Sequence, residues 1–357
     1  MVIQNYKLFT KKCNFGIHPR KDILLIICGS AASWIIKKVL QNKGGLHNRV
    51  SEKILLQPFT LFETEKFLIQ KGIKWSRYDI AQLYLTTGGI PYYLDSIRKG
   101  ENVSQFIDRA CFKANGVLYH EFDELYSSLF ANSHQHQLVV SQLAKVRQGL
   151  TREQLIQKTK LSSGGTFSTV LEELEESGFL VKSDEYSANI NAMRYKLIDN
   201  FTIFYFKFMI NKNKRITESW TKKVTNASWL SWSGFAFERM CFLHIRQIKR
   251  ALGLEVVASE VYTWSSKEDD GAQIDMLIER ADQIIHVCEI KFTKTKFAID
   301  KTYASNIRNK LSQFESLKQN KKKVMYFTMI TPYGVVNNEY YKELVQCEVV
   351  LNDLFLK

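Results

Sequence analysis

The alternation of apolar and polar positions divides the chain into stretches of different character. Residues 22–30 and 54–57 are short apolar runs, which predict strands buried on both faces of a parallel sheet. From residue 61 to about 131 the pattern is helical, and the pair Gly88-Gly89 followed by Pro91 predicts that one helix ends there and another begins. The first part of the chain is therefore expected to combine an α/β segment with a helical unit.

A different pattern covers residues 136–198. Regularly spaced apolar residues predict a first helix, Thr151 and Gln154 predict the capping-box start of a second, and a third begins near Gly165. Apolar segments at the two ends of residues 179–197 then predict a β-hairpin. Three short helices followed by a hairpin are typical of a winged helix-turn-helix.

The last part of the chain alternates helices with strands. After an aromatic connector and a basic stretch, the pattern predicts helices at 235–251 and 302–319, a short strand pair within 256–262, and strands at 273–279, 284–290 and 323–329. This order predicts an α/β domain with a mixed sheet.

Composition narrows the functional classes. Hydrophobic residues make up 45% of the 357 residues, which excludes a disordered chain, and 50 Lys and Arg against 36 Asp and Glu give a net charge of +14. Such an excess favours a polyanionic partner, although a basic enzyme without one remains an alternative. The six cysteines are scattered without a C-x-x-C pair, and no apolar run reaches the ~18 residues of a membrane span. We therefore expect a cytoplasmic protein.

The candidate chemistry lies on two adjacent predicted strands. Asp275 lies in one strand, and Glu289 and Lys291 lie at the end of the next, on the same face because strand side chains alternate. Two carboxylates and a cation are what metal-assisted phosphodiester hydrolysis needs: Asp275 and Glu289 to bind Mg²⁺, and Lys291 to assist the attacking water or the transition state. Glu238 on the preceding helix is a further candidate ligand, and Gln313 on the later helix is a candidate to reach the same edge.

An isolated pattern of this kind also occurs as an ion pair on an exposed sheet edge. Here Glu289 interrupts an apolar run, and burying a carboxylate is costly unless a partner or a metal compensates for it. The segment resembles the PD-(D/E)XK, restriction-endonuclease-like superfamily: Asp275, Glu289 and Lys291 match its core motif, and Glu238 matches the acidic residue of its first core helix. Ile274 stands where the motif writes proline. The resemblance implies a Mg²⁺-dependent nuclease.

Basic residues are dense around this motif. Between Lys291 and Lys323 there are ten Lys or Arg residues and two acidic ones, a stripe suited to a nucleic-acid backbone or, alternatively, a solvated helix face. The candidate recognition helix, residues 162–176, is acidic in its second half, which leaves DNA reading and a protein-docking or spacer role both open.

The opening residues are similar to the second half of a prokaryotic AAA-type ATPase, in the family that joins this ATPase to a winged helix and a nuclease-like domain, and this resemblance covers nearly the whole chain after about Lys21. The motifs are CGSAASW at 28–34 and GGIPYYL at 88–94. The resemblance gives Ser30 the place of the residue facing the γ-phosphate of ATP, and Arg49 that of the arginine finger. No G-x-x-x-x-G-K-[ST] loop is present, so the ATPase core lacks its Walker half, and we expect no autonomous ATP hydrolysis.

These observations predict four units: an ATPase remnant at 1–60, a helical lid at 61–132, a winged helix at 133–200 and a nuclease-like domain at 201–357. The favoured function is metal-dependent cleavage of DNA. The alternative is a non-catalytic DNA- or protein-binding remnant, or a regulatory subunit of an ATPase-family assembly that obtains its nucleotide through a partner. A homo-oligomer fits either case.

Overall fold

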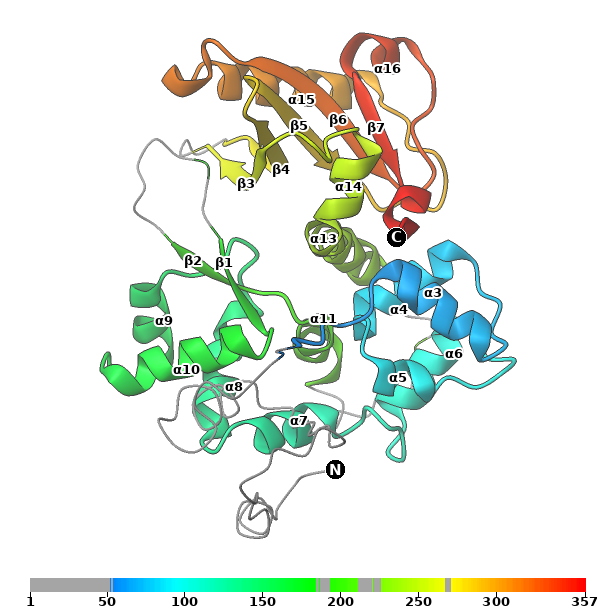
Figure 1. Cartoon of the computed structure of the whole chain (residues 1–357), viewed down its shortest axis with the longest axis vertical. Helices are drawn as coiled ribbons and strands as arrows, with labels where there is room; N and C mark the ends of the chain where they lie inside the picture. The colour runs from blue at the N-terminus through cyan, green and yellow to red at the C-terminus, as the bar shows by residue number, and fades with distance from the viewer. Residues whose placement is uncertain are drawn as a thin grey trace, which may run out of the picture.

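The computed structural model describes residues 52, 54–183, 186, 193–210, 220, 226–266 and 271–357. The fold is mixed α/β (Figure 1): a helical unit and a unit of three helices with a hairpin lie on either side of a central helix, and a five-stranded sheet lies above them. Ser30 and Arg49, with the strand expected at 22–30, lie outside the described residues.

The helical unit begins with a residue that caps its first helix. The Thr60 side chain accepts a hydrogen bond from the Glu63 backbone N–H, and Glu63 reaches back to the Thr60 backbone N–H, which closes a capping box. The helices are α3 (Leu61–Gln70), α4 (Arg77–Thr87), α5 (Pro91–Asp95), α6 (Val103–Ile107), a π-helical turn (Asp108–Phe112) and α7 (Glu121–Leu129). The predicted stop and start are confirmed: Gly88 ends α4 with φ +64°, and Pro91 opens α5.

The strand predicted at 54–57 is wrong. These residues form no strand, and Ile54, Leu55 and Leu56 are 77%, 70% and 87% exposed. No described strand lies beside them, because each of the seven described strands pairs within the hairpin or the five-stranded sheet. An apolar run without a neighbouring strand cannot complete its backbone hydrogen bonds as a sheet does.

The next unit has the predicted order of three helices and a hairpin. It contains α8 (Ser133–Leu143), α9 (Arg152–Thr159), α10 (Gly165–Glu176), β1 (Leu180–Ser183) and β2 (Arg194–Leu197), and the two strands are antiparallel. The capping box of Thr151 and Gln154 is confirmed. Arg152 donates to Ser163 O and Ser168 Oγ, so it braces α9 against the start of α10.

The connecting helices are α11 (Asn200–Phe204), a π-helical turn (Tyr205–Met209), α13 (Ala227–Leu243) and α14 (Ile245–Ala251). The single helix predicted at 235–251 is in fact two helices, which meet at His244. His244 Nδ1 bonds Met240 O at 2.9 Å, while its Nε2 accepts from the Leu61 backbone N–H at 3.0 Å. This long-range bond fixes the break at the start of α3, a contact that helical periodicity does not reveal.

The sheet has the order β3-β4-β5-β6-β7: β3 (Ser259–Ser265), β4 (Gln273–Arg280), β5 (Ile284–Ile290), β6 (Val324–Thr331) and β7 (Cys347–Val350). The first three strands are antiparallel, and β5, β6 and β7 run parallel. The predicted strand pair within 256–262 is instead the single strand β3, preceded by a loop, and β7 was not predicted.

Two helices cover opposite faces of the sheet. Phe237 and Met240 of α13 share one apolar core with Cys288 of β5, whereas Ala304 and Ile307 of α15 (Lys301–Glu315) belong to the other. The remaining elements are α16 (Glu339–Leu344) and the 3₁₀ turns Lys318–Asn320 and Leu351–Phe355. The predicted site residues lie at the end of the sheet where β4 begins and β5 ends, between the two helices.

Candidate functional site

Asp275 lies near the start of β4, directly across from the end of β5. The β4–β5 ladder pairs Met276 with Cys288, so the next position in this register sets Asp275 opposite Glu289. Asp275 is 8% exposed, and its Oδ2 accepts a hydrogen bond of 3.0 Å from the Ile290 backbone N–H. The end of β5 thus fixes the rotamer of this carboxylate.

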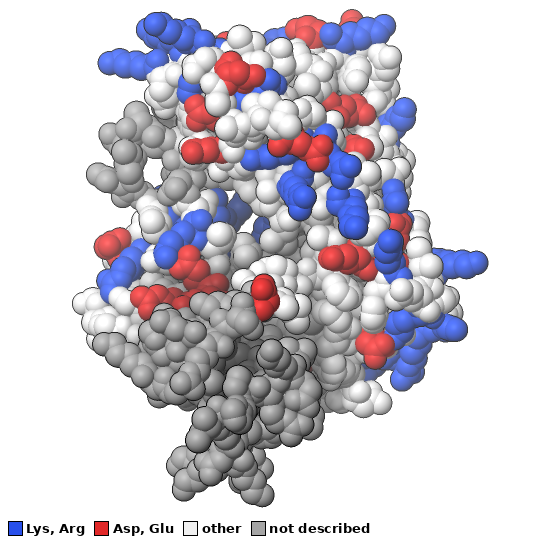
Figure 2. All heavy atoms as spheres, viewed as in Figure 1, with Lys and Arg blue, Asp and Glu red and all other residues white. Residues whose placement is uncertain are grey.

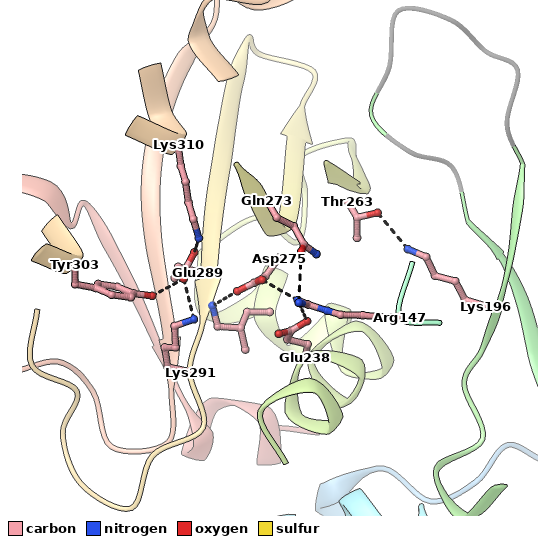
Figure 3. Close-up of polar contacts among 11 residues, drawn as sticks. Arg147, Lys196, Glu238, Thr263, Gln273, Asp275, Glu289, Lys291, Tyr303 and Lys310 are labelled. Carbon is pink, nitrogen blue, oxygen red and sulfur yellow. Dashed lines mark hydrogen bonds and ion pairs between the residues drawn. The ribbon is translucent and has the colours of Figure 1, made fainter. Parts of the chain in front are cut away.

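Glu289 is a buried carboxylate held by cations and a hydroxyl. It is 2% exposed, and its oxygens lie 2.9 Å from Lys291 Nζ and 2.8 Å from Lys310 Nζ. Tyr303 also donates its hydroxyl to Glu289 Oε1 (Figure 3). Burial by itself raises the pKa of Glu289, but Lys291 and Lys310 outweigh that effect and lower its pKa below the usual value.

Arg147 reaches the site from the loop that follows α8. Its Nη2 lies 3.0 Å from Asp275 Oδ1 and also contacts Glu238 Oε2, so one guanidinium joins a carboxylate of α13 to one of β4 (Figure 3). The guanidinium stacks over the Phe235 ring at 4.4 Å. The unit of three helices and a hairpin therefore contributes a cation to the edge of the sheet.

The carboxylates crowd one another electrostatically. Burial and the charge of Asp275 raise the pKa of Glu238 to about 7, and burial and the charge of Glu289 raise the pKa of Asp275. Burial opposes the charge on Lys291, but Glu289 and Asp275 raise its pKa, so it stays protonated. The site is an acidic cluster neutralised by side-chain cations.

The structure brings most of the predicted residues together. Asp275, Glu289 and Lys291 meet at one edge, and Glu238 joins them through Arg147. Gln313 points its amide to the chain just before β4. Its Oε1 lies 3.4 Å from the Ala272 backbone N–H, and its Nε2 donates to Asn309, and no contact with the carboxylates is among the described hydrogen bonds.

Three contributors were not singled out from the sequence as parts of the site. Lys310 lies about one turn before Gln313 on α15 and was counted only as part of the basic stripe; helix periodicity could have proposed it equally well. Tyr303 and Arg147 carry no local signal, because only the packing of α15 and of the loop after α8 brings them to the strands.

The three carboxylates predicted to bind a metal, those of Asp275, Glu289 and Glu238, do not converge on one point. Among the residues that the structure describes, no three His, Cys, Asp or Glu side chains are arranged to hold a metal ion. The physical reason is that Arg147 takes the facing oxygens of Asp275 and Glu238, while Lys291 and Lys310 hold Glu289. The donors nevertheless suit Mg²⁺ in type, since all are carboxylate oxygens.

No helix in the described part of the chain has the length and apolar character needed to cross a membrane.

Comparisons with known proteins give one distant relative. The chain is 23% identical over 256 residues to MJECL04, an uncharacterized protein of Methanocaldococcus jannaschii; the match covers 71% of this chain and 56% of the relative. The chain thus spans little more than half the length of the relative it matches. No family model and no solved structure matches the chain.

Proposed function

We propose that the sheet-bearing unit is a metal-dependent phosphodiester hydrolase that acts on DNA, with a PD-(D/E)XK-like site formed by Asp275, Glu289 and Lys291. The observation that carries this proposal is the pairing of two buried carboxylates across β4 and β5, with a protonated lysine 2.9 Å from one of them. Burial of charge at this density is costly for a purely structural edge.

In this proposal each residue has a defined task. Mg²⁺ bound by Asp275 and Glu289 would supply Lewis-acid charge and activate a water. The Ile290 backbone N–H orients Asp275 through its Oδ2, and Tyr303 and Lys310 hold Glu289 ionised. Lys291 places a positive charge where a phosphate oxygen gains negative charge in the transition state. Release of Arg147 from Asp275 Oδ1 frees that oxygen for the cation.

The other units keep their proposed assignments. The order of α8, α9, α10, β1 and β2 supports a winged helix at 133–200. The GGIPYYL segment, at the junction of α4 and α5, supports an AAA-type lid at 61–132.

The test is Mg²⁺- and Mn²⁺-dependent cleavage of plasmid, linear and branched DNA. Asp275→Asn and Lys291→Ala should each lower the rate by about 10² or more, as loss of a charge-stabilising group does in other enzymes. Lys74→Ala is the control, because Lys74 is an exposed lysine of the helical unit, outside the basic stripe. Cleavage that survives in both site variants would overturn the assignment.

The second candidate function is binding without cleavage, in which the C-terminal fold is a scaffold. The contact of Arg147 with both Glu238 and Asp275 favours it, because a guanidinium already neutralises the carboxylates. Arg147→Gln in the same assay separates the two candidates. A hydrolase needs less Mg²⁺ for half-maximal rate once this competing cation is gone, whereas a scaffold stays inactive at every Mg²⁺ concentration.

A further inference from the structure

A cavity of about 810 Å³ lies beside the candidate site. The β1–β2 hairpin and the loop after α8 line one side, and α13 with β3 and the start of β4 line the other. Glu238 and Asp275 are among the lining residues, so the cavity opens onto the acidic cluster. Its volume lies in the range of sites that enclose a small ligand, and it is too small for a nucleic-acid duplex.

Two residues of α13 that line this cavity carry side-chain donors without a hydrogen-bond partner. Arg239 Nε and Nη2 and Trp232 Nε1 are buried, and none has a hydrogen-bond partner among the described residues. The two residues are seven positions apart, which is about two turns, so they share one face of the helix. Burial lowers the pKa of Arg239 to about 10, and the residue is still protonated at pH 7.

Arg239 is half-buried, and two of its guanidinium nitrogens are buried without a hydrogen-bond partner, which is costly for a charged group. An unsatisfied buried donor on a charged group costs far more stability than an exposed ion pair contributes. Glu238 lowers this cost through its charge, but it contacts Arg147 and not Arg239. Both unused groups are donors, and the ligand that satisfies them is therefore an acceptor, most strongly an anion.

The other charges at the cavity agree with an anionic ligand. Lys145, Lys182, Lys196 and Lys207 line it together with Arg147 and Arg239, against Glu238, Glu260 and Asp275. Lys182 is held by Glu175 at 2.6 Å, and Lys196 donates to Thr263 at 3.1 Å. The register of the hairpin places these two lysines on opposite faces, and Lys196 is the one held toward β3 at the cavity.

Aromatic side chains line the same space. Phe242 and Tyr262 are half-buried, and Phe235 is 40% exposed beneath the Arg147 guanidinium. Unpaired bases bind proteins by stacking on such rings while their phosphates contact cations. A ligand that joins an anionic group to a flat ring would contact both the basic and the aromatic residues of the lining.

We propose that this cavity binds one or two unpaired nucleotides, with a phosphate on Arg239 and a base against the aromatic lining. The inference rests on the proposed function only where it makes an unpaired DNA strand the substrate held next to Asp275. Binding itself needs no cleavage and no metal, and it places an anion beside the two α13 residues whose donors have no partner.

The test is binding in EDTA, so that failure of the hydrolase proposal cannot mask the result. A fluorescein-labelled twelve-nucleotide dT strand, a blunt duplex of the same length and unlabelled dTMP are the probes. We expect Arg239→Met to weaken binding of the single strand at least tenfold and Trp232→Phe to weaken it several-fold. Arg246→Gln, on an exposed arginine of α14, is the control and should change affinity less than twofold.

A stability measurement separates recognition from structure. Because Arg239 carries two buried donors without a partner, Arg239→Met should keep or raise the melting temperature while binding falls. Competition by dTMP would identify a free nucleotide as sufficient, whereas binding of the strand alone would identify nucleic acid. Equal affinity of parent and Arg239→Met for the strand, or an equal dependence on Arg239 for the blunt duplex, would overturn the proposal.

Discussion

Glu289 shows how individual contacts decide the state of a buried group. Three polar groups from outside β5 surround it, so it stays ionised although it is almost fully buried. His286, three residues earlier on the same strand, shows the opposite outcome. It is 1% exposed, has one hydrogen bond, of 3.0 Å between Nδ1 and Thr328 Oγ1, and burial with the nearby Arg280 lowers its pKa to about 4.

The state of His286 predicts an acid-sensitive fold. Its pKa is near 6.5 when unfolded and about 4 when folded, so between these values the unfolded chain binds more protons and stability rises with pH. Acidification from pH 6.5 to 4 should therefore remove up to about 3 kcal/mol of unfolding free energy. Urea unfolding at a series of pH values measures this loss. His286→Gln should flatten the curve, and His134→Gln, at an exposed position, should not.

Local sequence predicts what local chemistry determines. Thr151 with Gln154, and Gly88 followed by Pro91, predicted helix ends correctly because caps and glycine act within a few residues. The proximity of Asp275, Glu289 and Lys291 could be predicted from the sequence, because it depends only on strand alternation and on the pairing of two consecutive strands. Arg147 and Tyr303 could not, because their positions depend on how distant helices pack.

At the scale of elements, the joint between α4 and α5 is held by close backbone contact. The Phe59 backbone N–H donates to Gly89 O at 2.7 Å, and a Cβ on Gly89 would lie 1.8 Å from Phe59 O. No rotamer can relieve that overlap, because both clashing groups are fixed to the backbone. The glycine in this motif is thus required by the approach of the preceding segment.

Gly89→Ala should therefore destabilise the protein by about 1–3 kcal/mol, the usual cost of forcing extra atoms into a packed site. Gly165→Ala is the matched control: Gly165 is the first residue of α10, and nothing lies within 4 Å of its added Cβ. Thermal unfolding of both variants measures the difference. Equal melting temperatures would show that Phe59 does not pack on Gly89 in solution.

At the scale of elements, prediction failed where an element depends on a distant partner. The run at 54–57 has strand character but no strand beside it, and His244 divides one periodic segment into α13 and α14 by bonding Leu61. β7 is four residues long and follows a short helix, so it gave little periodic signal. The spacing of apolar residues predicts where a helix or strand lies, but in these cases hydrogen bonds to distant residues determine whether it forms and where it ends.

Over the whole molecule, the basic stripe separates into two groups. Lys291, Arg308, Lys310 and Lys323 form ion pairs within the protein, whereas Lys294, Lys296, Lys301, Lys318, Lys321 and Lys322 are exposed without a described acidic partner. Figure 2 shows basic side chains projecting from the end of the molecule that carries α15. The exposed group is available to a polyanion, and the paired group is not.

Replacement of Lys318, Lys321 and Lys322 by glutamine should reduce the salt dependence of DNA binding. Each phosphate contact contributes about 0.9 to the slope of log K against log salt, so the slope should fall by up to about 2.7. Fluorescence anisotropy between 50 and 300 mM NaCl measures it. The control replaces Lys66, Lys74 and Lys99, three exposed lysines of the helical unit, with the same net charge change. Equal slopes in both triple variants would place binding elsewhere.

The hydrogen bond from Leu61 to His244 has a consequence for synthesis of the chain. The partners are 183 residues apart, and Asn200 similarly bonds Tyr84 O across 116 residues. The helical unit leaves the ribosome early, yet residues that complete its packing are translated much later. At 5–20 residues per second the delay is roughly 10–40 s, during which α4 exposes the surface that α11 and α13 later cover, and the start of α3 lacks its bond to His244. A nascent chain of this protein therefore has a long interval in which chaperones can bind α3 and α4.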